Sequence, residues 1–184
     1  MDMCSMSMAA LQPRFKFPQL IVMGVSGCGK SSVGEALAVH FSVPYIEGDA
    51  MHPPANIAKM SAGTPLDDSD RWPWLDALAA RLKEAVAQNG GAIASCSSLK
   101  KIYRDRLQAG SGPQTCFIFL DCSRKTLDRN QSARKGHFMP QSLLDSQLAT
   151  LEPPYDEARA ITIDGNQSFD AVIQSICAKL EQGT

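Results

Sequence analysis

A glycine-rich stretch near the N-terminus has the residue types and spacing needed to hold a phosphate group. Residues 24–31 read GVSGCGKS, a full match to the pattern GxxxxGK[ST]. An apolar run precedes this stretch and a helical pattern follows it, so we expect a loop that joins a strand to a helix. Glycine allows backbone angles that a Cβ would obstruct, and consecutive N–H groups of such a loop can therefore turn inward around an anion.

Each part of this loop has a predicted task in binding a nucleoside triphosphate. The N-terminus of the following helix adds partial positive charge, Lys30 reaches the outer phosphates and Ser31 offers a hydroxyl to Mg²⁺. The predicted nucleotide-binding residues of the loop are Gly24, Val25, Ser26, Gly27, Cys28, Gly29, Lys30, Ser31 and Ser32. A glycine-rich turn without a ligand is the alternative, and the spacing together with both flanking elements favours the nucleotide site.

A carboxylate follows the next apolar run along the chain. In a parallel sheet the end of that strand borders the same crevice as the phosphate loop, which places Asp49 near an acceptor hydroxyl. We predict that Asp49 orients this hydroxyl and takes its proton, or that it holds the water shell of Mg²⁺. The sequence does not separate these roles, and Asp49 could instead cap the helix that follows.

The remaining motifs favour a small-molecule kinase over other nucleotide-binding proteins. The chain has no NKxD motif, which switch GTPases use to read the guanine base. A motor or transporter ATPase needs a strand of four apolar residues that ends in aspartate, and the best candidate, FIFLD at 117–121, lies late in the chain.

Short apolar runs alternate with longer amphipathic ones, which is typical of a parallel sheet with helices on its faces. We expect strands at 19–23, 43–47, 92–96, 115–120 and 160–163. We expect helices at 30–41, 54–61, 73–89, 100–108, 123–133, 140–148 and 169–180. The predicted fold is a single α/β domain over 19–184, with a five-stranded parallel sheet, preceded by a flexible tail at 1–18.

Composition excludes several other classes of protein. The 184 residues include 18 Lys and Arg against 19 Asp and Glu, so the net charge of -1 provides no broad attraction for nucleic acid or an anionic membrane. No apolar stretch approaches the ~20 residues that cross a bilayer. The six cysteines are scattered without a CxxC pair, which indicates reduced thiols rather than zinc or disulfides. These features predict a cytoplasmic protein.

Several further blocks, taken in order, resemble the gluconokinases, a family of small phosphate-loop kinases. They are GDAMHP (48–53), PLDDSDRWPWL (65–75), CSSLKKIYRDRL (96–107), RKGHFM (134–139) and QLATLEPP (147–154). The resemblance implies ATP-dependent, Mg²⁺-assisted phosphorylation of D-gluconate at its 6-hydroxyl, giving 6-phosphogluconate, and it suggests a homodimer. Two alternatives are a kinase for another small hydroxy acid such as shikimate, and a catalytically silent nucleotide-binding module.

A sugar acid needs cationic groups for its carboxylate and short polar groups for its hydroxyls. The predicted acceptor-binding residues are Asp49, His52, Asn56, Arg71, Ser97, Lys100, Tyr103, Arg104 and His137. Three of them, Lys100, Tyr103 and Arg104, have the spacing of one helix face, which is alternatively a solvated face.

Two polar segments are expected to handle the ligands. Residues 48–72 are the predicted substrate-binding segment, in which Asp70 caps the long helix and Asp67 and Asp68 could steer the segment. Residues 134–154 are the predicted lid, because phosphoryl transfer must exclude water.

Arg134 in the predicted lid is expected to neutralise the transferring phosphoryl group, and with Lys30 and Asp49 it completes the predicted catalytic set. The gluconokinase pattern usually has an arginine six residues before the lid glycine, where this chain has Asn130, with Arg129 beside it. Arg129 therefore reaches ATP only if the helix adjusts locally. Asn166 lies in the turn expected to border the adenine, although a plain turn is an alternative.

Overall fold

The computed structural model describes residues 17–133 and 141–182 and contains a five-stranded parallel sheet. The strands are β1 (Gln19–Met23), β2 (Tyr45–Glu47), β3 (Ala92–Ser95), β4 (Thr115–Asp121) and β5 (Ala160–Asp164). Their order across the sheet is β2-β3-β1-β4-β5, and every neighbouring pair is parallel. The predicted α/β fold is confirmed, and it places the loop after β1 at the centre of the sheet.

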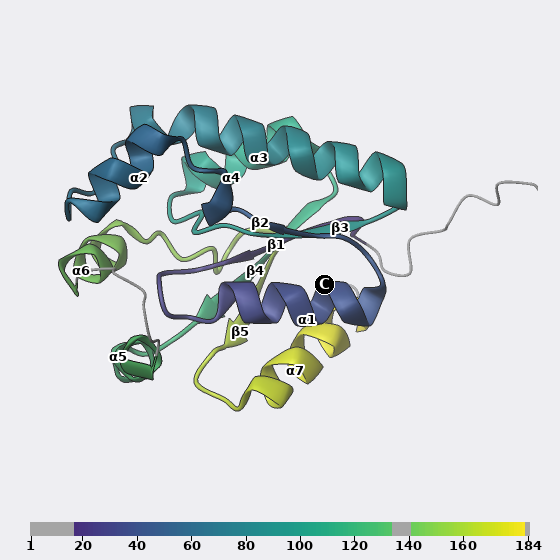
Figure 1. Cartoon of the computed structure of the whole chain (residues 1–184). Coiled ribbons are helices and arrows are strands. Elements are labelled where there is room, and N and C mark those ends of the chain that lie inside the picture. The colour runs from purple at the N-terminus through teal and green to yellow at the C-terminus, as the bar shows by residue number, and fades with distance from the viewer. Residues whose placement is uncertain (1–16, 134–140, 183–184) are drawn as a thin grey trace, which may run out of the picture.

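Helices cover both faces of this sheet. They are α1 (Lys30–Phe41), α2 (Pro54–Ser61), α3 (Asp68–Asn89), α4 (Lys101–Ser111), α5 (Arg124–Ala133), α6 (Gln141–Thr150) and α7 (Phe169–Gln182), with one 3₁₀ turn, η1 (Asp49–Met51). Figure 1 shows α1 and α7 on one face and α3 and α4 on the other, with α2, α5 and α6 at one end of the sheet. That end is where the β1, β2 and β3 strands finish.

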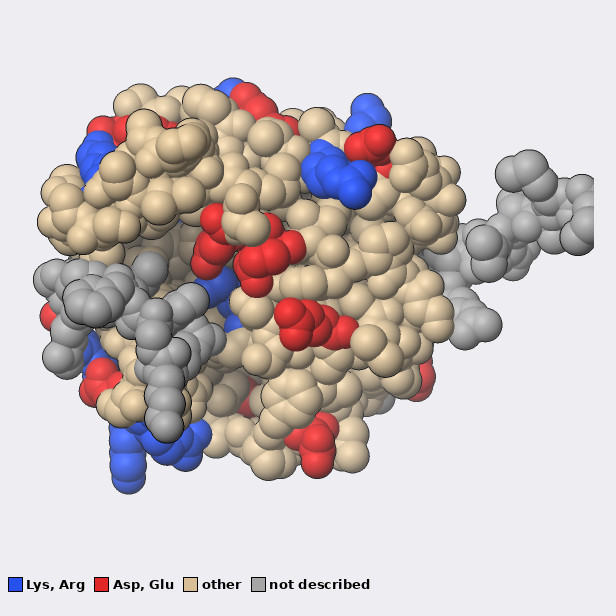
Figure 2. Space-filling view, viewed as in Figure 1, with Lys and Arg blue, Asp and Glu red and all other residues tan. Residues whose placement is uncertain are grey.

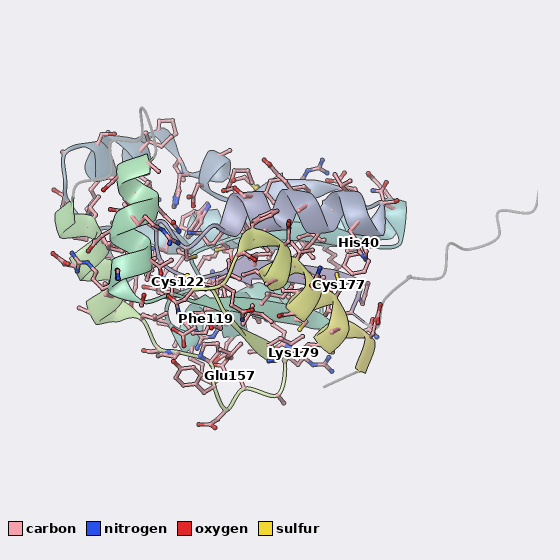
Figure 3. The ribbon with its side chains drawn as sticks, turned by 90° about the horizontal axis from the view of Figure 1, so that it is seen from below. His40, Phe119, Cys122, Glu157, Cys177 and Lys179 are labelled. Atoms are coloured by element: carbon pink, nitrogen blue, oxygen red, sulfur yellow. The ribbon has the colours of Figure 1, made fainter. Side chains whose placement is uncertain are left out.

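The core consists of two apolar layers, one on each side of the sheet. Along β1, Leu20 and Val22 pack toward α1 and α7, while Ile21 and Met23 pack toward α3 and α4. Successive side chains of a strand point to opposite faces, so a strand covered on both faces must be apolar throughout. Beside β5, Lys179 on α7 donates to the carbonyl oxygen of Thr162 at 2.8 Å (Figure 3).

The beginning of α3 differs from the prediction. Asp67, and not Asp70, is the N-cap: its carboxylate accepts from the Asp70 amide at 3.0 Å, and the Asp70 carboxylate accepts from the Asp67 amide at 2.9 Å. This reciprocal capping box satisfies two N–H groups at the helix start. The helix therefore begins at Asp68, five residues earlier than expected, and Pro73 lies inside it.

Phe17, at the end of the predicted N-terminal tail, packs onto the domain. Residues 1–16 lie outside the described part of the chain, but Phe17 is only 5% exposed and belongs to the apolar layer beneath α1 and α7. All five cysteines in the described ranges are free thiols, and burial raises the pKa of Cys96 to about 11. Within the same ranges, no helix is both long and apolar enough to cross a membrane.

Candidate active site

The loop between β1 and α1 has the conformation that a phosphate cradle requires. Gly24, Gly27 and Gly29 have φ angles of 140°, 87° and 96°, in the region that favours glycine. Gly29 is the N-cap of α1 and supplies no side chain, so the first N–H groups of that helix remain available to an anion. Lys30 is 8% exposed, and its Nζ lies 3.1 Å from the Val25 carbonyl oxygen, so the ammonium group sits against the loop.

Three segments distant in the sequence hold this loop. The Gly24 amide donates to the Ser97 carbonyl oxygen at 3.3 Å, just beyond the end of β3. Asn130 on α5 donates to the Gly27 carbonyl oxygen at 2.9 Å. Gln147 on α6 accepts from the Ser26 amide at 2.7 Å. The loop is therefore tied to β3, α5 and α6, and the side chains of Asn130 and Gln147 were not among the predicted site residues.

Glu47 is a further residue that the sequence reasoning missed. It ends β2 and accepts hydrogen bonds from Ser95 Oγ at 2.5 Å and from Tyr45 Oη at 2.8 Å. Burial works to raise the pKa of Glu47, but the hydroxyl of Ser31 and those of Ser95 and Tyr45 outweigh it, so the pKa is lowered. The signal was present in the sequence, since Glu47 ends an apolar run two residues before Asp49. Glu47 thus provides an ionised carboxylate beside the hydroxyl of Ser31, which is predicted to meet Mg²⁺.

Asp49 is positioned by a close approach between two strand ends. A Cβ on Gly48 would lie 2.0 Å from the Ser95 carbonyl oxygen, so only glycine fits there. Trp74 Nε1 donates to the Gly48 carbonyl oxygen at 2.7 Å. The chain then turns into η1 with Asp49 as its first residue, exposed and facing the same cavity as Lys30.

A cavity of about 900 Å³ lies between the phosphate loop, α2, the start of α3 and α6. Figure 2 shows this side of the molecule hollowed below α2. Eight of the predicted site residues line it together: Ser26, Lys30, Asp49, His52, Arg71, Ser97, Lys100 and Tyr103. The fold thus brings residues spread over positions 26–103 around one space that is large enough for a small ligand.

His52 lies between the acidic and the basic parts of this cavity. Its ring stacks on Trp74 with 3.9 Å between centroids. Burial lowers the pKa of His52; the charge of Asp49 opposes this shift and that of Arg71 adds to it. Its Nδ1 is buried and has no hydrogen-bond partner in the part of the chain that the structure describes. A neutral imidazole with one unused ring nitrogen can bind a hydroxyl in either direction of donation.

The cations at the far end of the cavity differ in what they have left to offer. Lys100 pairs with Asp68 at 2.7 Å, and Tyr103 also donates to Asp68, which lowers the pKa of that carboxyl. Arg71 lies over the Tyr103 ring at 5.4 Å, and its buried Nε has no partner among the described residues. Arg71 therefore keeps hydrogen-bonding capacity for a carboxylate, whereas Lys100 is already neutralised.

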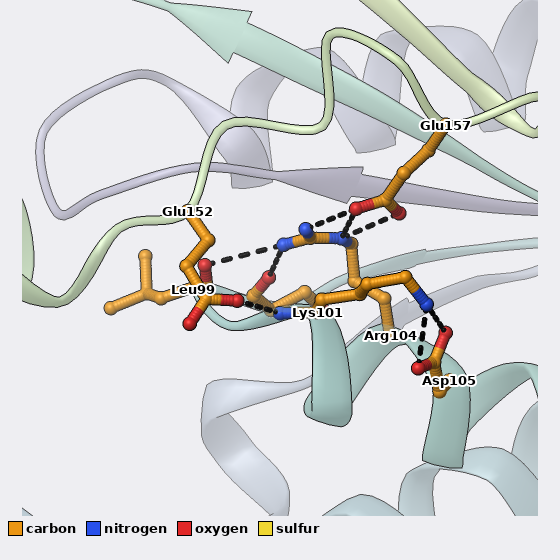
Figure 4. A network of polar contacts seen from close by, with 7 residues as sticks. Leu99, Lys101, Arg104, Asp105, Glu152 and Glu157 are labelled. Atoms are coloured by element: carbon orange, nitrogen blue, oxygen red, sulfur yellow. Dashed lines mark hydrogen bonds and ion pairs between the residues drawn. The ribbon is translucent and has the colours of Figure 1, made fainter.

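Arg104 does not belong to this site, contrary to the prediction. Its guanidinium is buried, pairs with Glu157 and donates to the Ser98 and Leu99 carbonyl oxygens at 2.9 and 3.2 Å (Figure 4). Of the three residues expected on one helix face, Tyr103 lines the cavity and Lys100 is the N-cap before α4, whereas the Arg104 side chain turns toward the loop before β5. Arg104 thus joins that loop to the end of β3.

Asn56 and Asn166 also have structural partners. Asn56 is 5% exposed and is absent from the cavity wall; it donates to the Asp70 carbonyl oxygen at 2.8 Å and so fastens α2 to α3. Asn166 accepts from the Ser123 amide and the Thr126 hydroxyl, both at 2.8 Å, which joins the turn after β5 to the start of α5. A role for Asn166 beside adenine stays a prediction.

The remaining predicted residues complete the picture. Val25 and Cys28 are buried, so they offer an incoming phosphate their backbone groups, and Ser32 is exposed on α1. Arg129 is exposed on α5, one position before the residue that contacts the loop. Arg134 and His137 lie outside the described residues, as does the first third of the predicted lid; its second part forms α6.

Comparison with known proteins decides between the small kinases. The sequence profile of the shikimate kinase family matches residues 26–181. A gluconokinase of Gluconobacter oxydans (strain 621H) is 46% identical over 166 residues, which are 90% of each chain. The chain belongs to the gluconokinase family. The crystal structure of a gluconokinase from Sinorhizobium meliloti 1021 has 46% identity and a TM-score of 0.81, and it covers 91% of this chain and 94% of that one.

The shikimate kinases share the fold of this chain, and their family profile matches it, but the pairwise identity to a solved shikimate kinase is low. The crystal structure of shikimate kinase from Aquifex aeolicus is 15% identical, with a TM-score of 0.55 over 89% of this chain and 96% of that one. An identity this low shows common architecture and carries no substrate. The shikimate alternative therefore loses support.

Proposed function

We propose that this protein transfers the terminal phosphoryl group of ATP to the 6-hydroxyl of D-gluconate, giving 6-phosphogluconate and ADP. The observation that carries the proposal is the single cavity in which the phosphate loop, through Ser26 and Lys30, faces Asp49, His52 and Arg71. Acceptor and donor must meet in one water-poor space for transfer to outcompete hydrolysis. The high identity to gluconokinases identifies the acceptor class.

The phosphate end of the cavity supplies charge and donors for ATP. Lys30 and the backbone N–H groups of the loop point at the phosphates, where they neutralise charge that spreads over the phosphoryl oxygens during transfer. The loop glycines already have the positive φ angles that such a cradle uses, and the Ser26 N–H and the Lys30 ammonium would exchange their contacts with Gln147 and Val25 for phosphate oxygens. Arg134 is the further cation we assign to this step from the sequence.

The carboxylates at the end of β2 divide the remaining work. We assign to Asp49 the acceptor 6-hydroxyl, whose direction it fixes and whose proton it takes as the bond to phosphorus forms. Glu47, ionised and close to Ser31, fits the outer shell of Mg²⁺ better.

The donor set fits a magnesium ion that is held mainly by substrate. Within the described ranges, no group of three acidic, histidine or cysteine side chains is arranged to hold a metal. Mg²⁺ usually keeps several waters and binds one or two protein ligands plus phosphates. One direct ligand, Ser31, together with water-mediated contacts from Glu47 and Asp49, is therefore sufficient to hold the ion on the ATP phosphates. When bound, the ion would neutralise charge on the ATP phosphates.

The acceptor end of the cavity reads the sugar acid. We assign the carboxylate of gluconate to Arg71, because its Nε is buried and unused in the described part of the chain. Neutral His52, on which the charges of both Asp49 and Arg71 act, is assigned to a hydroxyl of the carbon chain, as is Ser97, which lines the same cavity. The ends of an extended six-carbon acid would then be read by groups of opposite charge.

The proposal is tested by measuring ADP release in the presence of ATP, Mg²⁺ and one acceptor at a time: gluconate, other sugar acids, shikimate and nucleoside monophosphates. We expect fast ADP release when gluconate is the acceptor and slow release with each of the other acceptors. The Lys30→Ala variant is the control and should lose transfer to every acceptor, because the cation over the phosphates is gone. Turnover with shikimate instead, or ADP release that needs no acceptor, would overturn the assignment.

A further inference from the structure

Gln147 reaches from α6 into the phosphate loop. Its Oε1 accepts a hydrogen bond from the Ser26 amide, with 2.7 Å between the nitrogen and the oxygen. This contact is partly buried and joins residues that are 121 positions apart in the sequence. Gln147 also lines the acceptor cavity, together with Leu143, Ser146 and Thr150 of the same helix. One side chain therefore touches both the loop that holds phosphate and the space that holds the acceptor.

Ser26 occupies a particular place in that loop. Of the eight residues at 24–31, only Ser26 and Lys30 line the acceptor cavity. The phosphoryl group that is transferred must lie between the loop and the acceptor, so the loop N–H nearest the cavity is the one that faces the terminal phosphate. In this structure the neutral amide oxygen of Gln147 accepts the hydrogen bond from the Ser26 N–H, which a phosphoryl oxygen would accept in the ATP complex.

We propose that Gln147 is a further catalytic residue that touches the terminal phosphoryl group of ATP. Without nucleotide its amide oxygen fills the terminal-phosphate position on Ser26; with ATP bound, the phosphoryl oxygen takes that position and the side-chain amide turns its NH₂ end toward it. A donor held at this point stabilises the charge on the phosphoryl oxygens during transfer. The inference rests on the proposed function, because it requires ATP as the phosphoryl donor.

The two nucleotides of the reaction should then differ in how they meet Gln147. ADP has no terminal phosphate, so in its complex the bond between Gln147 and Ser26 persists. A nonhydrolysable ATP analogue must displace that bond and acquires the amide as a donor. Gln147 therefore affects binding of the triphosphate and leaves binding of the diphosphate nearly unchanged.

The test is calorimetric binding of ADP and of the ATP analogue AMP-PNP, each with Mg²⁺, to the full chain and its variants. Gln147→Glu puts a negative acceptor where a donor is needed, so we expect AMP-PNP affinity to fall about tenfold or more relative to ADP affinity. Gln147→Ala should lower kcat with gluconate by about tenfold or more at unchanged ADP affinity. Gln174→Glu, the same charge change at an exposed position of α7, should alter neither.

The outcomes separate this inference from the proposed function. If the unaltered chain binds neither nucleotide, the proposed function fails. If it binds both and Gln147→Glu weakens ADP and AMP-PNP equally or leaves AMP-PNP binding unchanged, Gln147 does not touch the terminal phosphate and only the inference fails. If Gln147→Glu does not fold, as its melting curve would show, the kcat and ADP affinity of Gln147→Ala decide alone.

Discussion

Asn130 Nδ2 lies 2.9 Å from the carbonyl oxygen of Gly27, and this bond fixes α5 against the phosphate loop. A Cβ on Gly27 would lie 3.1 Å from Gln131 Cγ and 3.3 Å from the Leu127 carbonyl oxygen, so the absence of a side chain lets the loop approach α5 closely at this point. The resemblance described in the sequence analysis implies an arginine at this position, where this chain has Asn130. In this chain the position stabilises the loop through a neutral hydrogen bond.

Asn130→Ala is therefore expected to raise the KM for ATP by about fivefold, the equivalent of one net hydrogen bond of roughly 1 kcal/mol. Steady-state kinetics at saturating gluconate measure this directly. The matched variant is Arg129→Ala at the exposed neighbouring position. A larger rise for Arg129→Ala than for Asn130→Ala would mean that α5 turns in the loaded enzyme and brings Arg129 to the nucleotide.

The role of Asp49 predicts a loss of turnover without a loss of nucleotide binding. Asp49→Asn keeps the size of the side chain and removes its charge and basicity, so kcat should fall at least ~100-fold. The affinity for ADP, measured by calorimetry, should stay within about twofold of that of the unaltered chain. Full turnover in Asp49→Asn would remove this residue from the mechanism and leave Glu47 as the carboxylate to test next.

Arg104 should matter for stability and not for the acceptor. Its guanidinium is buried on Glu157, whereas Lys101, on the same helix, forms an exposed pair with Asp105. We expect Arg104→Ala to lower the free energy of unfolding by about 3 kcal/mol, because it removes the cation that pairs with Glu157 and the donor to the Ser98 carbonyl oxygen, whereas the Leu99 carbonyl oxygen still accepts from the Glu152 amide. Lys101→Ala should leave the free energy of unfolding nearly unchanged, because its ion pair with Asp105 is exposed to solvent.

Urea unfolding measures the free energy of unfolding of both variants. The KM for gluconate is the second quantity to measure. At a temperature low enough for Arg104→Ala to be folded, its KM for gluconate should stay within about twofold of that of the unaltered chain. A large rise in that KM at normal stability would restore Arg104 to the acceptor site, as the sequence had suggested.

His52 predicts a pH dependence of stability. In the folded chain its pKa is below the ordinary value of 6.5, mainly through burial, so between that lowered pKa and 6.5 the unfolded chain binds more protons. The free energy of unfolding should therefore fall as the pH drops below 6.5 and stop falling below the folded pKa. Urea titrations from pH 7.5 to 5 measure this slope. It should be shallower in His52→Gln, and an identical slope in both proteins would contradict the assignment.

Local patterns were sufficient to predict the sheet and the phosphate loop. All five strands occur where short apolar runs predicted them, because a strand buried on both faces has to be apolar throughout. The loop could be recognised because its chemistry depends on adjacent backbone groups and on glycines at fixed spacing. The start of α3 was misplaced because two aspartates three residues apart both cap the helix, and the sequence does not say which one is outermost.

Side-chain partners distant in the sequence could not be predicted in the same way. Arg104 meets Glu157 across 53 positions, and Ser26 meets Gln147 across 121. No local rule relates such residues, because the sheet order and the packing of α6 bring them together. Glu47 differs: it was open to prediction as a polar end of an apolar run, but nearby Asp49 had already been assigned to the same chemistry.

The position of the phosphate on the product tests the central claim most directly. The protein is incubated with ATP, Mg²⁺ and D-gluconate, and the product is examined by phosphorus and carbon NMR. The account predicts a single phosphomonoester on C6 of gluconate, formed in equal amount to ADP. A phosphate on any other carbon, or inorganic phosphate in place of an ester, would contradict it.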